Sequence, residues 1–392
     1  MKKVTNLFNN LNDLQKILVV TILAIFLYGS SASAAYSVFS KVMRTGGSSG
    51  FISSIPTATS TLEEDPNEPK TEQCPLNGNM HTKAAKEAWE KRRPLAIMVE
   101  NHQESRPQSG LSSADIVYEA IAEGGITRFM ALYYCNLSDV QVGPVRSART
   151  YFLDWLGEYD ALYAHVGGAN TPGPADALSQ IIKYRVKDLN QFSIGFPIFW
   201  RDYQRLGHTV ATEHTMYSTT QKLWEIGSKR GWVAEDEDGN KWDENFTLWK
   251  FKDGKSASSS QVVKVPFWES QGAYTVLWVY DSTSNSYKRK HDGSDHTDLN
   301  NKKQLEAKNV VIQFERESNA NDGYENNVHL LYGTTGTGKV LIFQNGTLTE
   351  GKWTKATRIS RTKYTDSGSK EVEFVRGVIW IQTVPEGSNV TY

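Results

Sequence analysis

Two arginines stand close to the point where the chain is expected to enter a helix. Arg146 and Arg149 lie in residues 143–150 (GPVRSART), and we expect Ser147 to be the N-cap of a helix that runs from Tyr151. Arginine at a helix start opposes the helix dipole and costs about a few tenths of a kcal/mol unless a negative group offsets it. Free backbone N–H groups and the two guanidinium groups would together bind a phosphate, a sulfate or a carboxylate.

Two glutamates offer an alternative explanation for these arginines. Glu119 and Glu123 lie in residues 118–128 (YEAIAEGGITR), and they could pair internally with Arg146 and Arg149. Pairing and ligand binding are compatible if the carboxylates orient the guanidinium groups. A pair of carboxylates can also act as general acid and base on a glycan, but spacing along a strand does not define their separation.

Histidines downstream offer a second kind of chemistry. His165 ends a predicted strand and precedes a Gly-Gly loop, which is where α/β domains usually place their sites. With His208 or His214 and Asp202 it could bind a metal or transfer a proton. None of these residues belongs to a compact metal-ligand motif, and an isolated histidine is more often structural. We therefore predict neither a metal site nor a cofactor.

The candidate residues form two sets. The catalytic candidates are Glu119, Glu123, His165 and His214. The candidate ligand-binding residues are Arg128, Arg146, Ser147, Arg149 and Arg201.

Residues 333–339 (GTTGTGK) match the spacing of a phosphate-binding loop, but the match is incomplete. Val340 stands where that motif needs Ser or Thr, and the residues that follow have the pattern of a strand and a turn. Without a helix start the loop lacks the dipole that binds phosphate. We expect a β-turn here.

The elements that must position these candidates fall into two groups, which together predict an α+β fold. Residues 74–235 mix strands at 95–99, 114–120, 127–135 and 161–166 with helices at 150–158, 175–184 and 219–229. The run at 95–99 (LAIMV) is continuously apolar, as in a strand buried on both faces. We expect an α/β domain with a buried mixed sheet.

Residues 236–392 contain short β-rich runs separated by turn residues and no helical pattern. The expected strands are 246–251, 261–267, 274–280, 310–314, 328–332, 340–343 and 378–383. These runs predict a mostly antiparallel, β-rich C-terminal domain.

The N-terminus predicts export. Lysines at positions 2, 3 and 16 precede an apolar run, and residues 17–38 supply about the 20 residues that a membrane-spanning helix needs. The positive-inside rule then keeps residues 1–16 in the cytoplasm. Residues 32–34 (ASA) also suit a signal-peptide cleavage site. The first alternative gives a single-pass protein of the cell membrane with an extracytoplasmic body, and the second gives a secreted protein.

Residues 39–73 are rich in small and polar residues and predict a flexible linker between that segment and the folded body. Cys74 and Cys135 are the two cysteines of the chain and could form a disulfide outside the cytoplasm. The formal net charge of −1 argues against nucleic-acid binding through the overall charge of the chain.

Both halves of the chain contain several distinctive short motifs. Those of the N-terminal half are 93–101 (RPLAIMVEN), 106–111 (RPQSGL), 117–119 (VYE), 123–128 (EGGITR), 143–149 (GPVRSAR) and 165–168 (HVGG). Those of the C-terminal half are 338–340 (GKV), 345–346 (NG), 351–353 (GKW) and 380–382 (WIQ). Over about residues 93–385 the chain thereby resembles the YerB-like bacterial lipoproteins, a family classed as a domain of unknown function. The resemblance implies two-domain extracytoplasmic proteins and brings no established activity or catalytic residue. The chain departs from the lipoprotein pattern because it has an apolar N-terminal run and no cysteine placed for lipid attachment.

Two hypotheses for function follow. In the first, the protein is a membrane-anchored envelope protein that binds an anionic cell-wall polymer or an envelope protein. In the second, it is a hydrolase or transferase that acts on an envelope glycan or phosphoester with a Glu/Arg/His cluster. The discriminating observation is whether the candidate residues converge in one concave pocket.

Overall fold

The structure is a computed structural model that describes Lys16 and residues 64–392, except 237, 238, 245, 269, 292 and 325–328. The predicted membrane segment, residues 17–38, lies outside the described residues, as does the linker up to residue 63. Within the described part of the chain, every helix is too short or too polar to cross a membrane.

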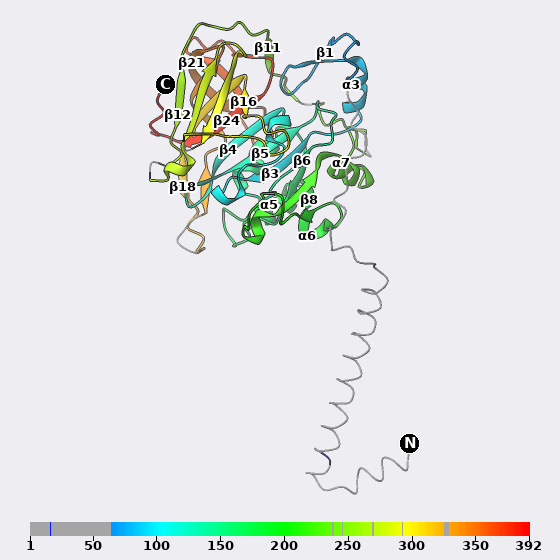
Figure 1. Cartoon of the computed structure of the whole chain (residues 1–392). Helices are drawn as coiled ribbons and strands as arrows, with labels where there is room; N and C mark the ends of the chain where they lie inside the picture. The colour runs from blue at the N-terminus through cyan, green and yellow to red at the C-terminus, as the bar shows by residue number, and fades with distance from the viewer. Residues whose placement is uncertain are drawn as a thin grey trace. The chain divides into compact units, whose positions relative to one another are not determined.

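The centre of the fold is a mixed sheet of ten strands from both halves of the described chain (Figure 1). Their order across the sheet is β22, β21, β20, β17, β24, β4, β5, β3, β7 and β8. The N-terminal half supplies β3 (Leu95–Glu100), β4 (Ile116–Glu123), β5 (Ile126–Tyr133), β7 (Leu162–His165) and β8 (Lys187–Asn190). The C-terminal half supplies β17 (Asn309–Glu315), β20 (Gly336–Gln344), β21 (Thr347–Lys355), β22 (Lys363–Asp366) and β24 (Ile379–Pro385).

Strand directions change across this sheet. In the N-terminal part, β5 is antiparallel to β3 and β4, whereas β7 is parallel to both β3 and β8. In the C-terminal part, β17, β20, β21 and β22 pair antiparallel in succession. The prediction of a mixed sheet followed by mostly antiparallel pairing is therefore confirmed.

The two halves meet where β24 pairs in parallel with β4. Ile379 lies opposite Ile116, and Gln382 lies opposite Glu119. β24 is also parallel to β17 on its other side, so the last strand of the chain is inserted into the middle of the sheet. The halves of the sequence thus share one sheet.

A second sheet lies in the C-terminal half and is antiparallel throughout. It contains β12 (Val262–Val265), β13 (Val276–Asp281), β14 (Ser286–His291), β15 (Ser294–Asp295) and β16 (Glu306–Ala307). Sequence analysis missed β14 because its SYKRKH sequence is polar. Its residues nevertheless alternate, with Tyr287, Arg289 and His291 buried on one face.

Smaller strand pairs complete the described structure. They are β1 (Glu72–Gln73) with β2 (Met80–His81), β11 (Lys250–Lys252) with β23 (Glu373–Val375), and β18 (Glu317–Asn319) with β19 (Leu330–Tyr332). A three-stranded sheet has the order β6 (Gln141–Val142), β10 (Met216–Thr219) and β9 (Trp200–Arg201).

The helices are short and belong to the N-terminal half. They are α3 (Lys83–Trp89), α4 (Thr150–Leu156), α5 (Ala177–Lys183), α6 (Gln191–Ile194) and α7 (Thr220–Lys229). Side chains cap α3, α5 and α7, because Thr82, Asp176 and Thr219 each accept a bond from a backbone N–H of the first turn. The three helices predicted around 150–158, 175–184 and 219–229 are confirmed.

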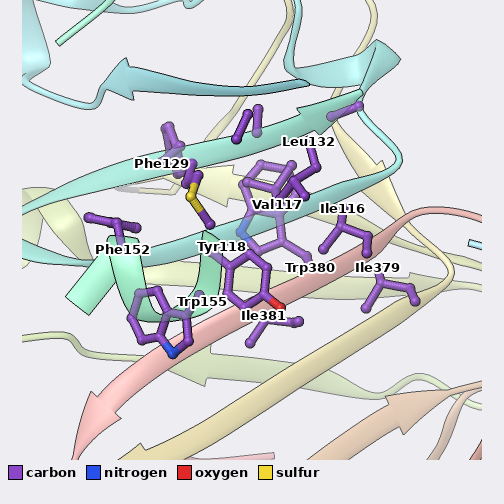
Figure 2. Packing of buried hydrophobic residues seen from close by; sticks show 14 of the residues in the cluster. Ile116, Val117, Tyr118, Phe129, Leu132, Phe152, Trp155, Ile379, Trp380 and Ile381 are labelled. Atoms are coloured by element: carbon purple, nitrogen blue, oxygen red, sulfur yellow. The ribbon is translucent and has the colours of Figure 1, made fainter. Parts of the chain in front are cut away.

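A continuous apolar core packs around the junction between β4 and β24. Figure 2 shows Tyr118 next to Trp155, and their rings stack with centroids 5.4 Å apart. Phe129 contacts Trp380 edge to face at 5.6 Å. The core therefore joins strands from both ends of the described chain.

The incomplete phosphate-loop motif lies in a β-structure. Gly336 and Lys339 belong to β20, which continues to Gln344 and turns into β21. The expected β-turn is therefore wrong for residues 336–339, which are strand, and the described residues show no helix after the motif.

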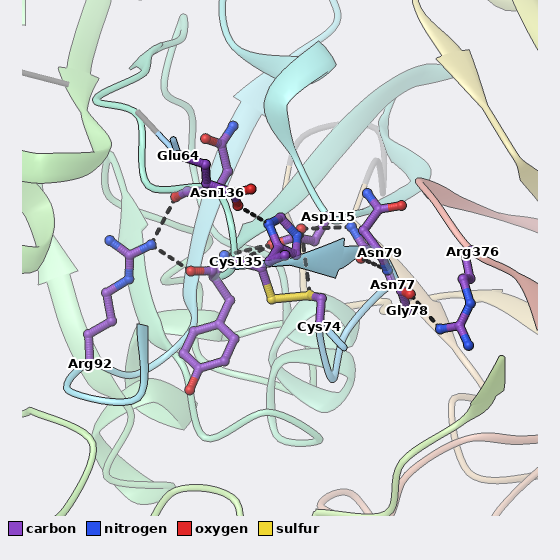
Figure 3. The surroundings of a disulfide bond; sticks show 12 residues. Glu64, Cys74, Asn77, Gly78, Asn79, Arg92, Asp115, Cys135, Asn136 and Arg376 are labelled. Atoms are coloured by element: carbon purple, nitrogen blue, oxygen red, sulfur yellow. Dashed lines mark hydrogen bonds and ion pairs between the residues drawn. A yellow bond between two sulfur atoms is a disulfide. The ribbon is translucent and has the colours of Figure 1, made fainter. Parts of the chain in front are cut away.

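Cys74 and Cys135 form a disulfide that attaches the β1–β2 segment to the end of β5 (Figure 3). The buried carboxylate of Asp115 supports the same junction. It accepts hydrogen bonds from Asn77 Nδ2 at 2.8 Å, from the backbone N–H of Tyr134 at 2.7 Å and from that of Cys135 at 3.1 Å.

Candidate functional site

One pocket brings together three of the five candidate ligand-binding residues. Arg146, Ser147 and Arg201 line a surface pocket with a volume of about 610 Å³. The rest of its lining comes from Val145, Val166, Gly167, Gly168, Asn170, Leu178, Phe192, Thr212, Glu213 and Met216.

Backbone hydrogen bonds hold the segment that carries Arg146. The N–H of Arg146 donates to Met98 O of β3 at 3.0 Å, and the N–H of Val166 donates to Arg146 O at 3.0 Å. The N–H of Val145 donates to Met216 O of β10 at 2.7 Å. Arg146 is therefore fixed to three strands or strand ends, although it lies outside regular secondary structure.

The Arg146 side chain is held by a buried carboxylate. Its Nε lies 2.5 Å from Oε2 of Glu100, at the end of β3, and about a quarter of the side chain is exposed. The same Glu100 oxygen lies 3.1 Å from Nδ1 of His214. Burial alone would raise the pKa of Glu100, but His214, Arg128 and Arg146 outweigh it and lower the pKa.

Arg201 carries a different set of contacts. Its Nη1 donates to the carbonyl oxygen of Thr212, and it also donates to Thr215 Oγ1 at 3.2 Å. Both acceptors are neutral, and no carboxylate of the described residues forms an ion pair with Arg201. The side chain is exposed, so its positive charge faces solvent at the pocket.

The remaining candidate arginines are buried around Glu123. Arg128 Nη2 lies 2.7 Å from Oε1 of Glu123, and Arg149 pairs with the other oxygen. Burial would raise the pKa of Glu123, but the two guanidinium groups outweigh it and lower the pKa to about 2. Arg128 and Arg149 therefore act as internal partners of a carboxylate, as the alternative explanation for Arg149 proposed.

The start of α4 differs from the expectation. Arg149 occupies the N-cap position without a side-chain cap hydrogen bond, and the helix begins at Thr150. Ser147 is not the N-cap, because residues 145–148 continue in extended backbone pairing with neighbouring strands. The carbonyl oxygen of Ser147 instead accepts a hydrogen bond from Arg128 Nη1 at 3.1 Å.

Glu119 lies in a separate buried network. Both of its oxygens accept from Arg289 Nη2 of β14 at 2.8 Å, and Oε2 also accepts from Trp380 Nε1 at 3.0 Å and from Gln382 Nε2 at 2.8 Å. Thr127 donates to Oε1 at 3.0 Å. Glu119 and Arg289 are both fully buried, so this carboxylate links the two sheets and does not face the pocket.

His165 is also buried and fully engaged. Its Nδ1 lies 2.7 Å from the carbonyl oxygen of Gly167, and its Nε2 lies 2.7 Å from Oδ1 of Asp188. The imidazole thereby shapes the Gly167–Gly168 loop at the wall of the pocket. Gly167 has a φ of +57°, and a Cβ on it would approach Phe192 to 2.8 Å.

The geometry gives a cationic surface pocket with an apolar wall. Arg146 and Arg201 supply the positive charge, and Glu213 supplies one exposed negative charge at the rim. Glu119, Glu123 and His165 do not line this pocket, and neither does His214, which contacts Glu100. Sequence analysis missed Glu100, which lies at the end of an apolar strand where a charged residue signals a partner.

Comparisons with known proteins agree with this architecture. Residues 81–233 match the N-terminal domain of a family described as "Protein of unknown function (DUF3048)", and residues 263–381 match its C-terminal domain. A Bacillus subtilis protein described as "Putative lipoprotein YerB" is 32% identical over 297 residues, which cover 75% of this chain and 82% of that protein.

A solved structure supports the same assignment. The crystal structure of the YerB protein from Bacillus subtilis superposes with a TM-score of 0.68 at 27% sequence identity. The match covers 82% of this chain and 100% of the crystallised chain. The resemblance noted in the sequence is thus confirmed, and the chain belongs to the DUF3048 family of proteins of unknown function.

Proposed function

We propose that the protein is a membrane-associated, extracytoplasmic binding protein that takes an anionic ligand of the cell envelope in the pocket between Arg146 and Arg201. The single observation that carries this proposal is the convergence of two arginines from distant segments on one pocket. Arg201 contributes most, because its charge has no carboxylate partner among the described residues. Guanidinium groups suit phosphate and carboxylate groups through paired N–H donors.

Three observations support the proposed location. The N-terminal lysines and apolar residues have the pattern of an export signal or anchor. The Cys74–Cys135 disulfide suits an oxidising compartment. A relative at 32% identity carries the description of a lipoprotein. Attachment through a single membrane helix remains our prediction for residues 17–38.

Binding is favoured over hydrolysis by the state of the candidate catalytic residues. A general acid or base needs access to the substrate. Glu119 and His165 are fully buried with their polar atoms engaged, and Glu123 is held by two arginines. His214 is buried against Glu100. The side chains that do line the pocket supply positive charge and a binding surface.

The test is retention of the purified protein on isolated cell walls, measured by sedimentation over a range of salt concentrations. We expect Arg201→Ala to weaken retention at least about tenfold, as loss of a charge-assisted contact should. Lys183→Ala is the matched control. Lys183 is exposed and positively charged, and it belongs to the same helix, α5, as the lining residue Leu178 but does not itself line the pocket.

The melting temperature should change little in both variants, because both side chains are exposed. Equal loss of retention in the two variants would mean that net charge, and not this pocket, governs binding. Retention that is unchanged in Arg201→Ala would contradict the proposal.

A further inference from the structure

Two histidines and a glutamate gather beside the pocket in a cluster that ligand binding by the arginines does not use. His102, Glu104 and His214 each place one potential ligand atom within 4.8 Å of the other two. His102 and Glu104 belong to the turn around η1 (Gln103–Ser105), directly after β3. His214 ends η3 (Thr212–His214), which precedes β10.

His214 is oriented as metal-binding histidines usually are. Its Nδ1 lies 3.1 Å from Oε2 of the buried Glu100, so the carboxylate accepts the proton that the metal-binding tautomer carries there. The opposite nitrogen, Nε2, faces Oε2 of Glu104 at 3.7 Å. The lone pair on Nε2 is then directed toward the other members of the cluster.

The other two side chains can close around an ion. The rings of His102 and His214 are stacked, at 9° and with centroids 4.8 Å apart, so binding of one ion by both requires the His102 ring to turn out of the stack. Donor atoms around a tetrahedral zinc ion lie about 3.3 Å from one another, given metal–nitrogen distances of about 2.0 Å. To reach this spacing, Glu104 and His102 must move toward His214. Both can do so, because the Glu104 side chain is 57% exposed and His102 is partly exposed.

Closing the site would break the His102–His214 ring stack and one long hydrogen bond. His102 Nδ1 accepts a hydrogen bond of 3.3 Å from the backbone N–H of Glu104, which is longer than usual. Binding through either ring nitrogen would replace this contact. Meanwhile, the backbone of β3 and the Glu100–His214 contact keep the rest of the site in place.

We propose that His102, Glu104 and His214 bind a divalent transition-metal ion of the zinc class, with Glu100 as a positioning residue. Two imidazoles and one carboxylate form a donor set that suits zinc, whereas calcium and magnesium prefer oxygen donors alone. Three protein ligands leave a fourth position for water or an anion. The proposal does not rest on anion binding by Arg146 and Arg201.

The alternative explanation, that the cluster binds no metal, must be excluded by experiment. Without an ion, His214 still contacts Glu100 and Glu104. The sequence predicted no metal site because the three residues lie in two segments about a hundred positions apart and form no compact motif. Binding of an ion is what separates the two readings.

The experiment is a zinc titration of the full-length chain after chelator treatment, read against a chromophoric competitor in the absence of any wall material. We expect one tight equivalent in the wild type and at least a tenfold weaker affinity in His102→Gln and in Glu104→Gln. His208→Gln and Glu87→Gln are matched controls, because they remove an exposed histidine and an exposed glutamate outside the cluster. Both controls should bind zinc as the wild type does.

Two further readouts make the result decisive. Zinc should raise the melting temperature of the wild type but not that of Glu104→Gln, because only a folded site binds the ion. Cobalt should give a visible absorption band in the wild type that both cluster variants lose. Absence of tight zinc binding, or equal binding by wild type and both cluster variants, would overturn the proposal. Wall retention measured in chelator tests the arginine pocket separately.

Discussion

At the scale of single residues, neighbouring arginines have different roles because of the carboxylates that reach them. Arg149 is buried and paired with Glu123, whereas Arg146 is held by Glu100 and still lines the pocket. Glu123 contacts both Arg128 and Arg149, so two buried guanidinium groups share one partly exposed carboxylate. A buried charge that loses its partner is strongly destabilising.

Replacing the shared carboxylate should therefore destabilise the protein. We expect Glu123→Gln to lower the free energy of unfolding by about 3 kcal/mol at neutral pH, because two buried guanidinium groups lose their counter-charge. Denaturant titration measures this loss. Glu87→Gln, an exposed and weakly paired glutamate, should change the free energy of unfolding by less than about 0.5 kcal/mol.

Glu123 should also account for part of the loss of stability at acid pH. The pKa of Glu123 falls from 4.5 to about 2 on folding, so the unfolded chain takes up the proton first as the pH drops. Its contribution to stability is complete above about pH 4.5 and is lost as the pH falls toward 2. The slope of stability against pH in this range should be shallower in Glu123→Gln. An equally stable variant at neutral pH, with an unchanged slope, would contradict the ion-pair account.

At the scale of elements, the β1–β2 segment depends on a covalent link to the end of β5. Cys74 and Cys135 are 61 positions apart, and their bond closes a long loop that includes α3, β3 and β4. Asp115 adds hydrogen bonds at the same junction. The segment itself contributes a two-stranded pair of two residues each, which is too short to be stable alone.

Loss of the disulfide should lower the stability of the body. We expect the free energy of unfolding of the Cys74→Ser, Cys135→Ser double variant to fall by about 4 kcal/mol. The reason is that the unfolded chain without the disulfide has more conformational entropy than the unfolded chain with it. Denaturant unfolding with and without a reductant measures the effect. The double variant should not respond to reductant, and the wild type should approach it under reducing conditions. Equal stability of the two proteins without reductant would show that the link is dispensable.

At the scale of the whole molecule, the two halves complete one another. β24 supplies a neighbour to β4, and Arg289 of the second sheet supplies the partner of Glu119. The core also draws on both halves, because Phe129 packs edge to face on Trp380. An isolated N-terminal half would expose the edge of β4 and leave Glu119 buried without its cation or facing solvent.

We therefore expect the halves to fold poorly when separated. Residues 64–235 and 236–392, produced alone, should lack a cooperative thermal transition, and co-expression should restore a stable complex. Circular dichroism melts and amide spectra measure this. A cooperative transition in either fragment would contradict this expectation. It would show that the predicted boundary at 235/236 separates independently folding domains.

What the sequence determined by itself was the local part of the fold. Apolar runs and helical periodicity predicted β3, β4, β5, β7, α4, α5 and α7, and the polar strand β14 was missed because its buried positions carry Tyr, Arg and His. Backbone preferences and apolar periodicity act over a few residues, so a local reading recovers them. The family could also be recognised from short motifs, and the comparisons confirmed it.

Only the tertiary structure decided which charged groups meet. Glu119 pairs with Arg289, 170 positions away, and not with the nearby arginines that the sequence suggested. Arg146 and Arg201 share a pocket, while Arg149, three positions from Arg146, is buried. Strand order and side-chain direction determine which charged groups become neighbours. Both depend on contacts between distant segments, which a local sequence pattern does not contain.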